Sequence, residues 1–292
     1  MVADLHALMG EYEDTSKLRH NSVEMVIDWL ACGIDPDKSA IFVQSEIPEH
    51  AELALILGMM TPLGWLERNP TYKEQLREIE GRDLTTFGFL GYPVLQAADI
   101  LLYKADKVPV GEDQLAHLEL TREIVRRFKN LYKKDIFPEP EALLTKEARI
   151  LGTDKRKMSK SYGNAINLSD TEEVLRKKVG GMLSDAKRVR KTDPGHPDEC
   201  FVHDYLRVFG NAALVQETDG WCLRGEKGCH DTKGILADVM VGRMKPIWER
   251  RRHFEKEKGL VEEVLKKGRE KASAVARGTL QEAKQLLNLY KS

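Results

Sequence analysis

The first half of the chain alternates short apolar runs with amphipathic stretches, and no other feature limits the fold as much. Residues 40–44 form a short, β-rich apolar run that predicts a buried strand, and 107–110 predict a second one. Helices with apolar residues on one side are predicted over 15–33, 48–60, 93–103 and 113–129. This order of helices and strands is typical of a parallel α/β sheet.

The strand pattern stops at about Leu168. Helical spacing then continues over 171–183, 199–209, 233–256 and 260–289. We therefore predict two domains, an α/β domain over 1–167 and an α-helical domain over 168–292. Basic runs at 176–191 and 250–271 lie in the helical half, and they fit either solvated helix faces or a polyanion-binding surface.

Composition narrows the class of protein. The formal net charge is −1 over 292 residues, so no overall basic excess indicates nucleic acid, although local basic faces can still bind it. No apolar run reaches the ~18 residues that a membrane span needs, and the acidic start, Met1-Val2-Ala3-Asp4, does not fit a signal peptide. Four cysteines in a chain of this size suggest reduced thiols. We expect a cytoplasmic protein without a membrane segment.

A strongly basic segment at 155–164 contains the pentapeptide Lys157-Met158-Ser159-Lys160-Ser161. Such a segment cannot bury itself, so it should form a surface loop. Its ammonium groups suit the negative charge that grows on a departing pyrophosphate. Because no glycine-rich phosphate loop occurs in the sequence, a generic ATP-binding protein is a weaker reading.

A second candidate site lies on the apolar helix predicted near 92–103. Tyr92, Gln96 and Asp99 are spaced to share one face of this helix. A carboxylate at this position is costly without a partner. Asp99 is therefore either a structural carboxylate bonded to a neighbouring element or the acceptor of an N–H or O–H group of a ligand.

These residues carry a resemblance to a known family. The pentapeptide is similar to the second signature of the class I aminoacyl-tRNA synthetases. Several separated segments, in the same order, closely resemble the tryptophanyl-tRNA synthetase family: 2–8, 44–50, 71–73, 92–101, 108–114 and 243–247. The similarity extends from residue 1 into the C-terminal helices.

The resemblance implies a Rossmann-like catalytic domain and a helical domain that binds the tRNA anticodon. It implies that ATP and Mg²⁺ activate L-tryptophan to tryptophanyl-adenylate, and that the acyl group is transferred to tRNA(Trp). A homodimer is also implied. Tryptophan–tRNA ligase activity is the function we expect.

The resemblance also implies roles for single residues. Asp99 would accept a hydrogen bond from the indole N–H of tryptophan. The other residues of the tryptophan pocket would be His6, Tyr92, Gln96, Ile100, Val108, Val110 and Gln114. The ATP site would contain Gly111, Glu112, Asp113 and Ile150 together with Lys157, Met158, Ser159, Lys160 and Ser161. Lys157, Lys160 and Lys73 would hold the triphosphate and the leaving pyrophosphate.

The first signature of the family, His-x-Gly-His, is absent, since no two of the eight histidines are three residues apart. By the resemblance, Met1–Asp4 matches the interior of a later strand, and we expect the chain to start about one strand and one helix late. A misassigned start, a truncation and a shortened paralogue are three open readings. We expect the chain to bind tryptophan better than it activates it; pyrophosphate exchange equal to that of an N-terminally extended version would contradict this.

Cys200, Cys222 and Cys229 resemble three of the four ligands of a 4Fe–4S cluster found in some members of the family. The fourth position holds Thr232. Because such a cluster normally needs four thiolates, we expect this candidate metal site to be degenerate.

Two rival functions remain at this point. A tyrosyl-tRNA synthetase would share the architecture and a buried acidic acceptor, and amino-acid-dependent pyrophosphate exchange would distinguish it. A non-catalytic paralogue that binds tryptophan or tRNA would explain the missing first signature, but it would have little need for the loop at 157–161.

Overall fold

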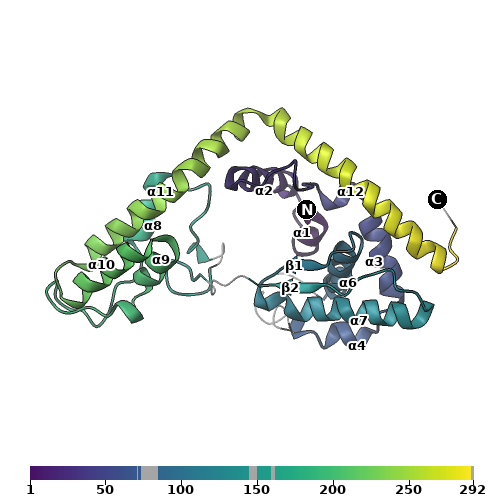
Figure 1. The fold of residues 1–292 in the computed structure, drawn as a ribbon, viewed down its shortest axis with the longest axis horizontal. Helices are drawn as coiled ribbons and strands as arrows, with labels where there is room; N and C mark the ends of the chain where they lie inside the picture. The colour runs from purple at the N-terminus through teal and green to yellow at the C-terminus, as the bar shows by residue number, and fades with distance from the viewer. Residues whose placement is uncertain (71, 74–84, 145–149, 159–161, 291–292) are drawn as a thin grey trace. The chain divides into compact units, whose positions relative to one another are not determined.

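A computed structural model describes residues 1–70, 72–73, 85–144, 150–158 and 162–290 of the protein. The chain forms two compact units, Met1–Thr145 with Glu257–Ser292, and Lys146–Lys256 (Figure 1). The C-terminal helix thus belongs to the first unit. The two domains predicted from the sequence, 1–167 and 168–292, stay a prediction.

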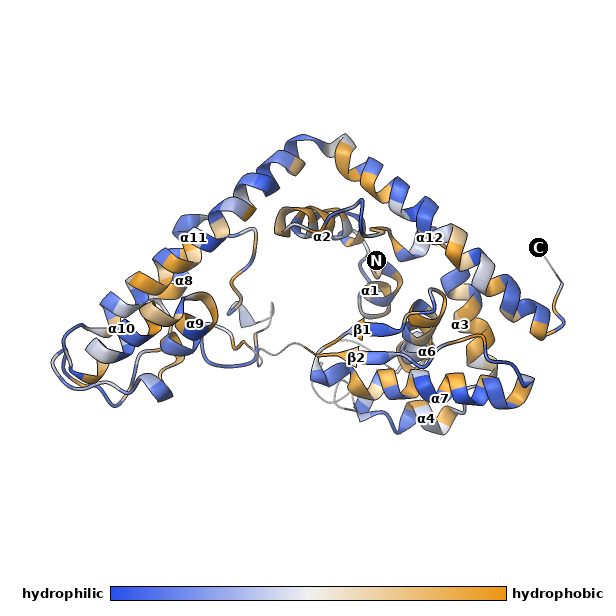
Figure 2. Cartoon of the chain, in the orientation of Figure 1, coloured by the Kyte–Doolittle hydropathy of each residue, from blue (hydrophilic) through white to orange (hydrophobic). Residues whose placement is uncertain are grey.

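The first unit is built mainly of helices around a small sheet. Its helices are α1 (Asp4–Glu11), α2 (Leu18–Cys32), α3 (Glu49–Met60), α4 (Leu63–Glu67), α6 (Phe87–Leu101), α7 (Leu115–Tyr132) and α12 (Lys258–Leu286), with the 3-10 helices η1 (Gln44–Glu46) and η2 (Glu112–Gln114). Helix α6 packs against both α3 and α7, which explains why so many of its side chains are apolar. Figure 2 shows α3 largely apolar, whereas α12 alternates apolar and polar residues along its length.

A two-stranded parallel sheet confirms the predicted α/β class. Strand β1 (Lys107–Pro109) pairs with β2 (Glu141–Leu143), and Val108 lies opposite Ala142. The predicted strand at 40–44 is reduced to one parallel bridge, between Val43 and Val2. It ends there because the chain turns directly into η1.

Helix α12 covers the other side of this segment at very short range. A Cβ atom added to Gly268 would lie 1.8 Å from the carbonyl oxygen of Ile41, so only glycine permits this approach. Apolar residues of α12 also join the core formed by α3, α6 and α7. They are Ala272, Ala276, Leu280 and Ala283.

The second unit is helical, as the sequence predicts for most of its length. Its elements are α8 (Glu172–Gly180), the 3-10 helix η4 (Pro197–Glu199), α9 (Phe201–Phe209), α10 (Ala212–Leu223) and α11 (Cys229–Lys256). Its core is formed by α8, α9 and α11 and includes Leu175, Leu206 and Leu236, which are fully buried. Among the described residues of the whole chain, no helix is both long and apolar enough to cross a membrane.

Candidate active site

Asp99 is the centre of a buried polar network in the first unit. Its side chain, which α6 carries, is only 10% exposed. Gln44 Nε2 and His50 Nδ1 both donate to Asp99 Oδ1, each over 2.7 Å. His6 Nε2 donates to Asp99 Oδ2, also over 2.7 Å. Three separate segments, α1, η1 and α3, thus supply the partners that a buried carboxylate requires.

These partners keep Asp99 ionised. Burial alone would raise the pKa of its carboxyl group, but the hydrogen bonds and the charges of His50 and His6 outweigh burial and lower this pKa below its ordinary value. An ionised carboxylate has about four lone-pair sites and only accepts hydrogen bonds. It is therefore a fixed negative acceptor at neutral pH.

His50 links Asp99 to a third polar group. Its side chain is completely buried, and its Nε2 lies 2.8 Å from the Tyr103 hydroxyl. Burial raises the pKa of Tyr103 far above its ordinary value, so the hydroxyl keeps its proton and hydrogen-bonds to Nε2. His50 Nδ1 donates to Asp99, because an ionised carboxylate only accepts hydrogen bonds. Gln44, His50 and Tyr103 were not among the residues predicted for the site, although Tyr103 lies only four residues after Asp99, in the turn that follows α6.

Tyr92 belongs to a separate buried pair. Its hydroxyl lies 2.8 Å from His117 Nε2, and the Asn69 amide nitrogen lies 2.9 Å from His117 Nδ1. Burial raises the pKa of Tyr92 to about 12 and lowers that of His117. Both groups are therefore neutral at physiological pH, and they hold the ring of Tyr92 in place beside α7.

The other predicted pocket residues are brought together only in part. Gln96 Nε2 donates to Gln114 Oε1 over 3.3 Å, which joins α6 to η2. Ile100 is buried on α6, Val108 is half-buried in β1, and the Val110 amide donates to the carbonyl oxygen of Leu143.

The predicted ribose segment lies where β1 leads into α7. Gly111 precedes η2, and a Cβ atom added there would lie 2.6 Å from Asp113 Oδ1. Glu112 and Asp113 are exposed, and Gln114 donates to Asp113 Oδ2 over 2.9 Å. This is the carboxyl end of a parallel strand, the position at which α/β sheets bind their ligands.

The predicted phosphate-binding residues lie in both units. Lys73, in the first unit, is exposed. In the second unit, Ile150 is 36% exposed, Lys157 is exposed and Met158 is half-buried. Ser159, Lys160 and Ser161 lie outside the described residues. Lys157 takes part in an antiparallel bridge with Leu151 that opens the loop.

Comparison with known proteins assigns the family. The family described as "tRNA synthetases class I (W and Y)" matches this chain over residues 1–241. The tryptophan–tRNA ligase of Thermotoga maritima is 49% identical over 292 residues, which cover 99% of this chain and 88% of that protein. The ligase of Aquifex aeolicus is 42% identical, with 99% of this chain and 90% of that protein covered. The chain belongs to the tryptophan–tRNA ligase family.

A solved structure of this family agrees with the fold. Tryptophanyl-tRNA synthetase from Campylobacter jejuni, complexed with ADP and tryptophan, superimposes with a TM-score of 0.88 at 33% identity. The match covers 98% of this chain and 88% of that structure. The expected Rossmann-like class I fold with a helical C-terminal region is confirmed, as is the expected family.

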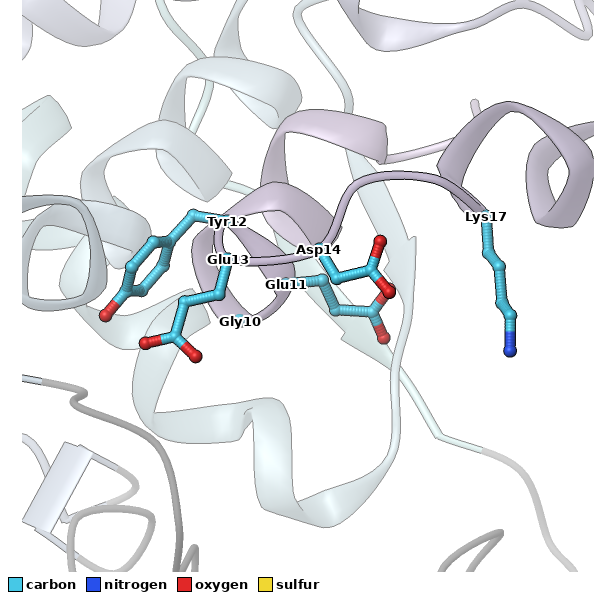
Figure 3. A pocket seen from close by; sticks show the side chains of 6 residues that line it. All are labelled: Gly10, Glu11, Tyr12, Glu13, Asp14 and Lys17. Carbon is cyan, nitrogen blue, oxygen red and sulfur yellow. The ribbon is translucent and has the colours of Figure 1, made fainter.

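A cavity of about 290 Å³ at the end of α1 is a poor candidate for the ATP site of a tRNA ligase. It lies in the turn that leads to α2 (Figure 3). Three of its lining residues are acidic, Glu11, Glu13 and Asp14, and one, Lys17, is basic. The excess of carboxylates would repel a triphosphate.

Cys200, Cys222 and Cys229 provide one thiol too few for the 4Fe–4S cluster considered from the sequence. Cys200 and Cys222 are buried, Cys229 is half-buried, and all three are free cysteines. Thr232 occupies the fourth position and donates from Oγ1 to the carbonyl oxygen of Gly228 over 3.4 Å. Within the described part of the chain, no group of three or more histidine, cysteine or acidic residues could hold a metal ion.

Proposed function

We propose that this chain is a tryptophan–tRNA ligase, which activates L-tryptophan with ATP and transfers it to tRNA(Trp). The observation that carries the proposal is the ionised, buried Asp99. Oδ1 of Asp99 accepts from both Gln44 and His50. Oδ2 accepts from His6, and its second lone-pair site suits one further donor, the indole N–H.

This acceptor selects tryptophan by penalising its analogues. A ligand that lacks a donor at this point leaves one acceptor site of the Asp99 carboxylate unfilled where the ligand excludes water. We propose that Tyr92, Gln96, Gln114 and the apolar side chains of Ile100, Val108 and Val110 enclose the ring.

The activation step needs no covalent enzyme intermediate. An oxygen of the tryptophan carboxylate attacks the α-phosphate of ATP, the bond to the β-phosphate oxygen breaks, and pyrophosphate leaves with that electron pair. We assign Lys73, Lys157 and Lys160 to the phosphates, where their ammonium groups stabilise the growing charge. Gly111, Glu112, Asp113 and Ile150 would contact the nucleoside. Mg²⁺ would enter bound to ATP and neutralise part of the phosphate charge. The described residues provide no group of three or more histidine, cysteine or acidic ligands for it.

We propose that the helical region binds tRNA(Trp), and that the enzyme is a homodimer in the cytoplasm. The basic run at 176–191 supports tRNA binding only weakly. Arg176 is paired with Glu172 and Asp238, Lys178 with Asp170, and Lys187 with Glu199. Much of its charge is therefore neutralised within the protein.

Amino-acid-dependent exchange of pyrophosphate into ATP tests the proposal. We expect exchange with L-tryptophan, and a rate at least about 100-fold lower with L-tyrosine. A site built around one specific hydrogen bond discriminates strongly against a ligand that cannot make it. Equal exchange with both amino acids, or exchange with neither, would contradict it.

A further inference from the structure

One buried amide, that of Asn164, lies at the base of the signature loop, residues 157–161. Asn164 is only 3% exposed. Its Nδ2 donates to Asp154 Oδ1 over 2.7 Å and to the carbonyl oxygen of Lys157 over 3.1 Å. The main-chain carbonyl oxygen of Asn164 accepts from the Thr153 amide over 2.9 Å. Asn164 thus ties the chain that enters the loop to the chain that leaves it.

The turn before the loop is shaped to fit this amide. A Cβ atom added to Gly152 would lie 2.3 Å from Asn164 Nδ2, so a side chain there would displace the amide. Lys155 adopts a left-handed conformation with φ of 67°, and its amide donates to the carbonyl oxygen of Gly152. The Gly152 amide in turn donates to the carbonyl oxygen of Arg156 over 2.7 Å.

Asp154 is an acidic group among the cations of this segment, and its lone pairs are filled. Oδ1 accepts from Asn164 and from the Arg156 amide, and Oδ2 accepts from Arg156 Nε over 2.8 Å and pairs with Nη2 over 2.6 Å. The Asn164 hydrogen bond is the largest cause that lowers the Asp154 pKa to about 2. These four contacts match the capacity of a carboxylate.

Lys157 is exposed, and none of the ion pairs among the described residues includes it. Without Asn164, Asp154 Oδ1 would lose one of its two donors, three residues before this lysine in the sequence. A carboxylate so placed would compete with phosphate for the ammonium group. The guanidinium carbon of Arg156 also lies 4.7 Å from the centre of the Tyr162 ring.

We propose that Asn164 is a positioning residue for phosphate handling, a role that rests on the proposed function of the loop. Through the carbonyl of Lys157 it fixes the direction in which the loop leaves its base. Together with Arg156 it occupies Asp154, so that the ammonium group of Lys157 is left for the phosphates of ATP.

The test uses the full chain, with Asn164→Ala, Asp154→Asn, the double variant, and Asn167→Ala as the matched control. Asn167 also reaches a carboxylate, Asp170 Oδ1 at 3.4 Å, but in an exposed turn of the same unit. The measurements are kcat and KM for ATP in tryptophan-dependent pyrophosphate exchange, together with tryptophan and inorganic pyrophosphate binding by calorimetry.

For Asn164→Ala we expect kcat/KM for ATP to fall about 10- to 100-fold, as misplaced reacting groups do. Tryptophan affinity should change less than twofold, which also reports a folded first unit. Asp154→Asn added to Asn164→Ala should restore most of the loss, and Asn167→Ala should match the parent.

Parental kinetics in Asn164→Ala would overturn the inference. A double variant no better than Asn164→Ala would overturn the role of Asp154 as a competitor. If the parent shows no tryptophan-dependent exchange, the proposed function fails, and pyrophosphate binding still tests the inference. It should then weaken at least fivefold in Asn164→Ala, and unchanged binding would refute it.

If Asn164→Ala lacks the thermal transition of the second unit, Asn164→Ser keeps a small polar side chain and is measured in the same way. An effect of the same sign supports the inference, and parental behaviour overturns it.

Discussion

The Asp99 network and the signature loop handle charge in opposite ways. Asp99 is 10% exposed and is held by three donors from three different segments. Lys157 is exposed on a loop whose base is tied by one buried amide, Asn164. A fixed buried charge suits the choice of one amino acid, whereas exposed ammonium groups suit a phosphate group that arrives and then leaves. Recognition and chemistry should therefore be separable by mutation.

Asp99→Asn should cause the largest effect. An amide carries no charge and keeps only one acceptor oxygen, so its NH₂ group faces either His6 or the donors Gln44 and His50. We expect kcat/KM for tryptophan to fall at least about 100-fold, the cost of breaking a buried charged network. Affinity for pyrophosphate should stay within twofold. Asp106→Asn, an exposed carboxylate just after α6, is the control. A loss of pyrophosphate affinity in Asp99→Asn as large as the loss in kcat/KM for tryptophan would contradict the separation of amino-acid recognition from phosphate handling.

Lys157→Ala should show the reverse pattern. We expect kcat for pyrophosphate exchange to fall about 10- to 100-fold, because one group that stabilises the leaving pyrophosphate is removed. Calorimetry should give an unchanged tryptophan affinity. Lys177→Ala removes an exposed lysine from α8 in the same unit and should leave both quantities as in the parent. Weaker tryptophan binding in Lys157→Ala would show that the two sites are coupled.

Gly268→Ala tests how the first unit supports its network. The added Cβ would meet the backbone of Ile41, three residues before Gln44, so α12 or this segment must shift. We expect the free energy of unfolding to fall by about 1–3 kcal/mol, as overpacking does, and tryptophan affinity to fall with it. Urea denaturation measures the first effect.

Gly278→Ala is the matched control on the same helix, because no atom lies within 4 Å of the added Cβ. It should raise the free energy of unfolding by about 0.5–1 kcal/mol through helix propensity. Equal effects of the two substitutions would mean that the contact at Ile41 is unimportant.

The pH dependence of stability should show the smallest effect. The folded-state pKa of Asp99 lies below the ordinary value of 3.8, so this carboxylate contributes stability that is fully present above pH 3.8. The contribution should be lost as the pH falls below 3.8, through the folded pKa. The difference in unfolding free energy between the parent and Asp99→Asn, measured from pH 6 to pH 3, should be constant at first and then shrink. A difference that grows on acidification would contradict the direction of this pKa shift.

Sequence reasoning predicted the fold best where it depends on local patterns. Helix α2 ends where Gly33 was expected to end it, and Gly33 has a left-handed conformation with φ of 100°. The strand at 40–44 was overestimated because its pairing depends on Val2 and on the approach of α12, which lies more than 200 residues away in the sequence. Helix α10 was missed because its apolar residues are not concentrated on one side of the helix, although Asn211 caps its first turn.

The candidate site was predicted only for residues with a local signal. Asp99 was identified because a carboxylate in an apolar helix needs a partner, but the pattern does not say which partner. Gln44 and His50 are 55 and 49 residues away in the sequence, and only tertiary packing brings them to Asp99. Asn164 escaped notice for the same reason, since its role comes from burial beneath a turn.

The most direct test of the account compares tryptophan with β-(3-benzothienyl)alanine, in which sulfur replaces the indole N–H. Calorimetry on the parent should give at least about tenfold tighter binding of tryptophan, because the analogue has no N–H group to donate to Asp99 Oδ2. In Asp99→Asn this preference should disappear. Equal affinities for the two ligands in the parent would show that Asp99 is a structural carboxylate and that tryptophan is recognised by other groups.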